Sequence, residues 1–143
     1  MTDPASLISN HTLHAAGNSL PQLFENIARE LLKLFIDTET VGEVLREKIV
    51  VEAADSALLL QGWVNALLGL SSTQHLLFKA YRFQQFEAER QGAGHLRAEI
   101  TGELVDPHRH TFLKDPALWH CAQVALINTS KCIEAEVILT AKP

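Results

Sequence analysis

The fold is decided by residues 17–36, which read GNSLPQLFENIARELLKLFI. Ser19 stands three residues before Gln22, which is the spacing of a capping box. Pro21 falls in the first helical turn, where the N–H that proline lacks would have no partner within the helix. Apolar side chains then recur every three or four residues as far as Ile36. These signals predict an amphipathic helix whose continuous apolar stripe must be buried against a core.

Outside this helix, alternating and β-branched segments predict strands on both sides. One strand is expected over residues 6–16, before the helix, and another over residues 46–53, after it. Asp55 then caps a second helix, whose apolar residues keep the helical period as far as Ser71. Two hairpins follow, with strands expected over residues 76–87, 95–105, 118–128 and 132–140.

The predicted elements follow the order strand, helix, strand, helix and four further strands. Two helices cannot cover both faces of such a sheet. We therefore expect them to pack together on one face of a mostly antiparallel, curved sheet, which defines an α+β fold. No repeat or linker interrupts the sequence, and its 143 residues are predicted to form one domain over residues 1–143.

Composition excludes several classes of function. Apolar residues make up 47% and charged residues 20%, which is ordinary globular usage. The net charge is −5, and direct nucleic-acid binding is not expected because it needs clustered cations. The first residues lack the apolar core of a signal peptide, and no apolar run is long enough to span a membrane. We therefore expect a cytoplasmic protein without membrane contact.

The seven histidines are the main chemical peculiarity of the sequence. His108 and His110 form a His-x-His pair, and Asp106 lies two residues before it. On an extended segment these three side chains would share one side, which suits a transition metal. The competing interpretation is that they are solvated residues near a loop, because Pro107 and the expected turn disturb that geometry.

No nucleophilic or phosphate-binding motif stands out in the sequence. Cys121 follows His120, but adjacent residues on a strand point to opposite faces, so this pair is not expected to act in catalysis. Residues 92–94 contain two glycines without the following helix that would aim amides at a phosphate, and we interpret them as a hairpin turn. A free-standing enzyme is therefore the least favoured interpretation.

Several segments, taken in their order along the chain, resemble the archease family. They are Gly17-Asn18-Ser19-Leu20 with Leu23-Phe24-Glu25, Val51-Glu52-Ala53 running into Asp55, Leu58-Leu59-Leu60, Trp63-Val64-Asn65 with Leu67-Leu68, Leu77-Phe78, and Gly102-Glu103-Leu104-Val105-Asp106 with His110 four residues later. The similarity covers residues from about 7 to 140. It implies a small cytoplasmic protein of strand-helix-strand-strand type. Archeases help a tRNA-splicing RNA ligase by promoting its guanylation with GTP and enabling multiple turnover, and are not ligases themselves.

The metal site implied by this resemblance carries over only in part. The family opens with His-Thr-Ala-Asp, whose Asp helps to bind a divalent metal, and the matching positions end at Asn10. The second metal-binding Asp of the family falls near Thr140, so an amide and a hydroxyl replace two carboxylates. The Lys-Ala-x-Thr-Tyr-His segment of the family is replaced by the residues around His120. Asp106 and His110 do match.

Two functions follow as hypotheses. The first is a non-catalytic archease-like accessory protein that acts by protein–protein contact, either on an RNA ligase in tRNA processing or on another enzyme. The alternative is a small-molecule-binding or transition-metal-binding domain. Its metal ligands would be Asp106, His108, His110 and Asn10, with His120 as a further candidate. Apart from such a divalent metal, no cofactor is expected.

Overall fold

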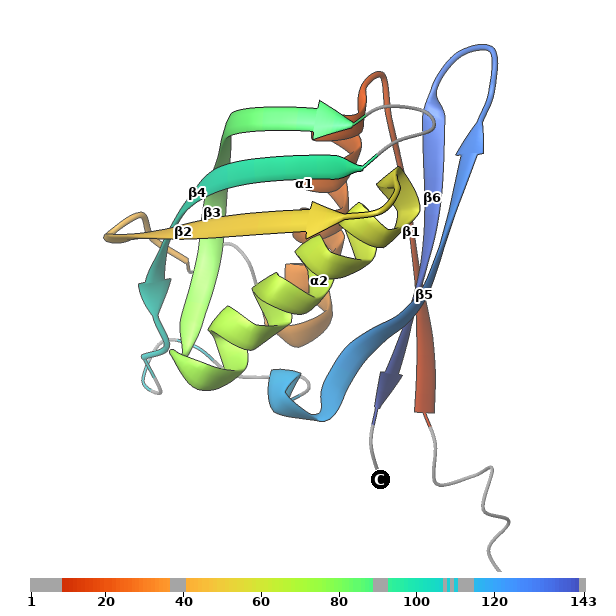
Figure 1. Ribbon diagram of the computed structural model, residues 1–143. Helices are drawn as coiled ribbons and strands as arrows, with labels where there is room; N and C mark the ends of the chain where they lie inside the picture. The colour runs from red at the N-terminus through yellow and green to blue at the C-terminus, as the bar shows by residue number, and fades with distance from the viewer. Residues whose placement is uncertain are drawn as a thin grey trace, which may run out of the picture.

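The computed structural model describes residues 9–36, 41–88, 93–106, 108, 110 and 115–141. Figure 1 shows the helices and strands of this part of the chain. The helices are α1 (Leu20–Phe35) and α2 (Ser56–Thr73), and the strands are β1 (Ser9–Gly17), β2 (Leu45–Ala53), β3 (Leu76–Ala88), β4 (Gly94–Leu104), β5 (Trp119–Asn128) and β6 (Ile133–Ala141). A short 3₁₀ helix, η3 (Pro116–Leu118), precedes β5. The predicted elements are confirmed to within about two residues, except that residues 6–8 of the first predicted strand lie outside the described residues.

The six strands form two antiparallel sheets of three strands each. The first sheet has the order β1-β6-β5 and the second the order β2-β4-β3. The α+β class, the antiparallel pairing and the packing of the helices on one face are confirmed, and the structure adds that the expected single sheet is divided in two. Within the first sheet the first strand pairs with the last, Ser9 opposite Ala141. No local sequence pattern reports such a long-range pairing.

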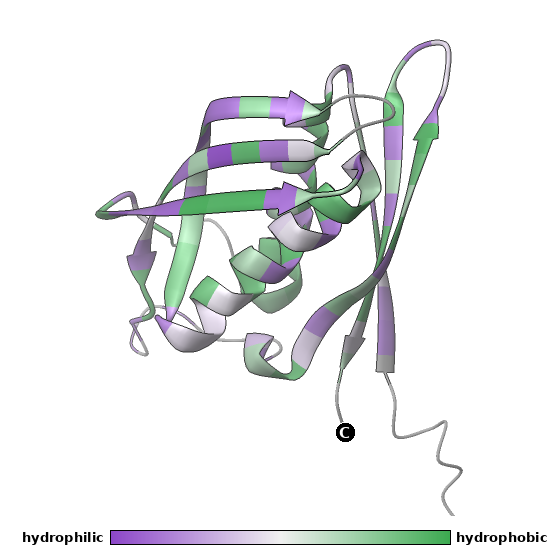
Figure 2. Ribbon diagram, in the orientation of Figure 1, coloured by the Kyte–Doolittle hydropathy of each residue, from purple (hydrophilic) through white to green (hydrophobic). Residues whose placement is uncertain are grey.

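The two helices occupy the space between the sheets (Figure 1). Helix α1 packs mainly on β1, and α2 packs mainly on β5 and β2. The strands show alternating polar and apolar bands in Figure 2, as expected when one face of each sheet is buried. No helix in the described part of the chain has the length and apolar character needed to cross a membrane.

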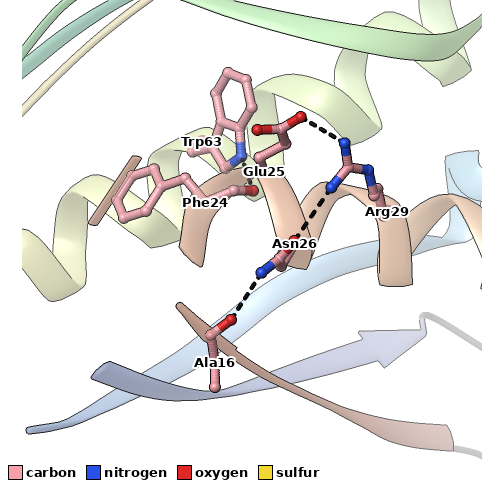
Figure 3. Close-up of polar contacts among 6 residues, drawn as sticks. All are labelled: Ala16, Phe24, Glu25, Asn26, Arg29 and Trp63. Atoms are coloured by element: carbon pink, nitrogen blue, oxygen red, sulfur yellow. Dashed lines mark hydrogen bonds and ion pairs between the residues drawn. The ribbon is translucent and has the colours of Figure 1, made fainter. Parts of the chain in front are cut away.

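The core between the sheets contains the two aromatic residues that the helical stripes predict there. Phe24 and Trp63 are completely buried. Their rings lie 6.5 Å apart between centroids, and the Trp63 indole N–H donates a hydrogen bond to the Phe24 carbonyl (Nε1···O 3.0 Å; Figure 3). The indole therefore links the two helices while satisfying its own polar atom. The prediction that both residues belong to the core is confirmed.

Both helices begin at the residues that the sequence predicts. The Ser19 hydroxyl accepts the Gln22 N–H (3.3 Å), and the Gln22 side chain accepts the Asn18 N–H in return (2.6 Å). The Asp55 carboxylate accepts the Leu58 N–H at the start of α2 (2.8 Å). These bonds satisfy amides that a helix leaves without partners in its first turn.

Candidate functional site

Asn10, Thr140 and His120 lie side by side across the first sheet. Asn10 on β1 is the register partner of Thr140 on β6, and Thr140 is in turn the register partner of His120 on β5. The Thr140 hydroxyl donates a hydrogen bond to the Asn10 side-chain oxygen (3.1 Å). The next residue along β6, Leu139, is completely buried. Because side chains alternate along a strand, the row of three faces away from the helices.

This row does not fit a hard divalent cation. Calcium and magnesium need several oxygen ligands, preferably carboxylates. Asn10 and Thr140 offer one amide oxygen and one hydroxyl, which already bond each other. His120 would add only a nitrogen, which suits softer metals. The residues present therefore do not reproduce the divalent-metal site that the family resemblance implies.

Asp106 and His110 form a hydrogen-bonded turn after β4. The Asp106 N–H donates to His110 Nδ1 (2.9 Å), and the His110 N–H donates to the Asp106 carbonyl (2.7 Å). Because Nδ1 accepts a hydrogen bond, the imidazole proton is assigned to Nε2, which lies 3.0 Å from Glu103 Oε1. Both ring nitrogens are therefore used within the fold.

Glu103 fastens this turn to a distant segment of the chain. Its carboxylate lies 3.0 Å from His110 Nε2. The same carboxylate accepts the Gly42 N–H from the segment before β2 (3.0 Å). Glu103 and His110 are only 8% and 4% exposed. A buried carboxylate is tolerated when it has such partners. The sequence does not predict an individual role for Glu103. The only local feature that could have indicated one is a carboxylate at the end of an apolar strand.

The four predicted metal ligands lie in two different places. Asn10 belongs to the first sheet, whereas the other three follow β4 of the second sheet. His108 is exposed, and its backbone N–H donates to the Asp106 carboxylate (2.9 Å), so that carboxylate stabilises the turn. Within the described ranges, no three His, Cys, Asp or Glu side chains are grouped so that they could hold a metal ion. The metal role of Asp106, His108, His110 and Asn10 stays a prediction.

The amide side chains of α2 hold a bulged part of β5. The register of β5 and β6 shifts between Cys121 and Gln123. Asn65 accepts the Cys121 N–H (2.8 Å) and donates to the Cys121 carbonyl (3.3 Å), to which Gln61 also donates (3.1 Å). These side chains therefore satisfy backbone groups that the bulge takes out of the ladder. On the opposite helix, Asn26 likewise donates to the Ala16 carbonyl of β1 (2.7 Å; Figure 3).

Cys121 is unsuited to nucleophilic chemistry. Its side chain is 1% exposed, and burial raises the pKa of the thiol to about 11. The thiolate, which is the reactive form, is therefore disfavoured. The neighbouring His120 is exposed, as expected for adjacent residues on opposite faces of a strand.

The fold and the comparisons place this chain among known proteins. The solution structure of Methanobacterium thermoautotrophicum protein 1598 matches it with a TM-score of 0.68, covering 93% of this chain and 97% of that one at 20% identity, so the two share an α+β fold. The sequence model described as the archease protein family matches residues 10–139. The protein archease of Methanosarcina acetivorans is 30% identical over 87% of this chain and 85% of its own length. That of Methanosarcina mazei is 26% identical with the same coverage. The chain belongs to the archease family.

Proposed function

We propose that this protein is a non-catalytic accessory factor that assists a tRNA-splicing RNA ligase. It would bind the ligase, promote its guanylation with GTP and allow multiple turnover. The observation that carries this proposal is membership of the archease family over residues 10–139. The chain and its Methanosarcina acetivorans relative also cover each other over 87% and 85% of their lengths, so the likeness extends over nearly the whole fold.

The chemistry of the described residues supports an accessory role. The polar residues within the family-like segments are engaged in the fold: Glu103 bonds His110, and Asn65 bonds the backbone of Cys121. The Cys121 thiol is buried and stays protonated near neutral pH. A protein with such side chains acts most directly through its surface, by changing the conformation or substrate access of a partner.

The test uses the RNA ligase of the same organism. Purified ligase is incubated with GTP, with and without this protein, and the guanylated ligase and the number of RNA joining events per ligase molecule are measured. We expect both quantities to rise with added protein, while the protein alone with GTP and RNA gives neither a guanylated species nor a joined product. An equal concentration of an unrelated acidic protein is the control. Unchanged guanylation and turnover at saturating protein would contradict the proposal.

A further inference from the structure

Each of the two sheets ends in two edge strands, and a free edge strand can pair with a strand from another molecule. The edge strands are β1 and β5 in the first sheet and β2 and β3 in the second (Figure 1). Three of these edges carry features that natural proteins use to prevent such pairing. Two register shifts interrupt β3, and one bulge, held by α2, interrupts β5. The β2 strand carries two cations and two acids.

The β1 strand has none of these protective features. It pairs with β6 in unbroken register from Ser9 to Gly17. It contains no Lys, Arg, Asp, Glu or Pro, and its only titratable side chains are those of His11 and His14. The whole chain has a net charge of −5, so β1 is an edge without fixed charge on an acidic protein. Among the described edge strands, β1 is therefore the one most open to a further strand.

The register of the first sheet shows which backbone groups of β1 face outward. Cys121 on β5 engages both its N–H and its carbonyl with the Asn65 side chain of α2, so these groups turn away from β6. Its register partner on β6, Leu139, therefore directs its own N–H and carbonyl to the other side, toward β1. The partner of Leu139 on β1 is His11, so the backbone of His11 bonds β6.

Backbone direction alternates along an antiparallel strand, so Asn10, Thr12, His14 and Ala16 face the open edge. The Ala16 carbonyl fits this assignment, since the Asn26 side chain of α1 reaches it (2.7 Å). In the described part of the chain, no other backbone group or side chain bonds the outward N–H and carbonyl groups of Asn10, Thr12 and His14. Three residues of β1 thus present unused donors and acceptors in a row.

We propose that two copies of this chain pair through their β1 edges, antiparallel about a two-fold axis at Thr12. Because Asn26 occupies the Ala16 carbonyl, the free segment runs from Asn10 to His14, and Thr12 is its centre. The axis places Thr12 opposite Thr12 of the second copy and Asn10 opposite His14 of the second copy. Each pair of this kind exchanges two backbone hydrogen bonds, and such a self-complementary contact closes as a dimer. This self-association does not depend on the proposed contact with a ligase.

The side chains of this segment are complementary to themselves. Asn10, Thr12 and His14 are exposed. The Asn10 oxygen already accepts the Thr140 hydroxyl, which leaves its amide N–H groups to donate to a ring nitrogen of His14 of the second copy. Threonine opposite threonine is a favourable cross-strand pair, because the two hydroxyls bond each other. No like charges meet at the axis when the histidines are neutral.

A second copy fits this edge better than an unrelated peptide does. Peptides that add to a sheet edge are selected by pockets that take their alternate side chains. Two cavities of about 910 and 250 Å³ lie at the β5–β6 hairpin and between α1 and β3, and neither includes a residue of β1. The edge offers backbone bonds and a short neutral row of side chains, which an identical strand matches.

The size of the contact predicts a weak dimer. A single strand pair buries less than the roughly 1,200–2,000 Å² of a stable complex, so the dimer should form only as the protein concentration rises. Because no ion pair contributes, the affinity should be the same at low and high salt.

The experiment compares two lysine variants with the same change in charge. Thr12→Lys places a cation at the centre of the open edge, where it meets its own copy, and Gln123→Lys places one at an exposed position on β5 of the same sheet. Sedimentation equilibrium is measured from about 10 µM to about 1 mM, the range suited to a contact of this size. We expect wild type and Gln123→Lys to dimerise with equal affinity, and Thr12→Lys at least about tenfold more weakly. Circular dichroism checks the fold, and His14→Lys replaces Thr12→Lys if that variant does not fold.

Amide hydrogen exchange locates the contact. In concentrated wild-type protein, exchange at the Asn10, Thr12 and His14 amides should be slower than in dilute protein, whereas Thr12→Lys should show no such difference. Wild-type protein that stays monomeric at about 1 mM would overturn the inference. A dimer that Thr12→Lys retains, or that Gln123→Lys loses to the same extent, would place the contact on another surface and overturn it as well.

Discussion

Gly102 has no room for a side chain. A Cβ atom at this position would lie 1.8 Å from the Leu77 carbonyl oxygen of the neighbouring strand. That oxygen belongs to the backbone, so Gly102→Ala requires β3 and β4 to separate, and we expect a loss of more than about 3 kcal/mol in the free energy of unfolding. Gly69 is the matched control, because nothing lies within 4 Å of its added Cβ and it stands inside α2. Urea denaturation should show Gly69→Ala to be more stable than wild type by roughly 0.5–1 kcal/mol. Equal stability of the two variants would contradict this explanation.

The two cysteines should differ sharply in reactivity. Burial raises the pKa of the Cys121 thiol to about 11, whereas Cys132 is only half-buried. Alkylating reagents attack the accessible thiolate, so native protein at about pH 8 should take up one iodoacetamide adduct, at Cys132, and denatured protein two. Mass spectrometry after digestion gives the site. Native modification of Cys121 as fast as that of Cys132 would show that the thiol is not protected by the fold.

The raised pKa of Cys121 also has a consequence for stability. Above about pH 8.5 the unfolded chain begins to lose this proton, while the folded protein keeps it until about pH 11. The unfolded state then binds fewer protons than the folded state, so the contribution of this thiol to stability is present at neutral pH and is lost as the pH rises through that window.

At the scale of single elements, variants in the turn after β4 can distinguish a structural role of its histidines from a metal-binding role. His110 is buried and bonds Glu103, whereas His108 is exposed. We expect His110→Ala to lower the free energy of unfolding by roughly 1.5–3 kcal/mol, as for lost hydrogen bonds to a charged group, and His108→Ala to change it by less than about 0.5 kcal/mol. Thermal denaturation is then repeated with zinc. A zinc-dependent rise in the melting temperature of wild type that is absent from both variants would establish the metal role instead.

The row across the first sheet predicts how metal binding could be restored. Wild-type protein is expected to show little or no binding of calcium or magnesium, because Asn10 and Thr140 bring no charge and bond each other. In the double variant Asn10→Asp/Thr140→Asp, two carboxylates would face each other across β1 and β6, and we expect measurable calcium affinity by calorimetry. Each single variant should bind more weakly than the double variant. Tight calcium binding by wild type, lost in Asp106→Asn, would instead place the cation in the turn after β4.

The elements that could be predicted from the sequence are those specified by local chemistry. Ser19 and Asp55 cap their helices as expected, and the stripes of α1 and α2 place Phe24 and Trp63 in the core. The pairing of β1 with β6 could not be predicted, because register depends on residues more than a hundred positions apart. The same holds for the bond between Glu103 and Gly42, which joins the end of β4 to the segment before β2. The family-like segments contain Gly102, Asn65 and Glu103, whose contacts are structural, so the resemblance identified the fold better than the site.

At the scale of the whole molecule, the two sheets present different surfaces on either side of one helical layer. The outer row of the first sheet is uncharged at Asn10, Thr140 and His120 when the histidine is neutral, whereas the outer face of the second sheet mixes cations such as Lys48 with carboxylates such as Glu52. Because both sheets bury their inner residues against the same two helices, the outer surfaces are fixed relative to each other. A partner that docks on the outer face of one sheet would therefore leave the outer face of the other sheet exposed.

The shared helical layer predicts that the protein unfolds as one cooperative unit. Trp63 stands in the core between the helices, and Trp119 stands at the start of β5 in the first sheet. With Trp119→Phe, fluorescence reports the core alone, while far-ultraviolet circular dichroism reports all elements. Since α1 and α2 each contact strands of both sheets, neither sheet can lose its inner packing without exposing the apolar surface of the helices to water. We expect the two signals to give the same urea midpoint and the same dependence on urea, as in a two-state transition. Separate midpoints would mean that one sheet unfolds while the other stays packed on the helices.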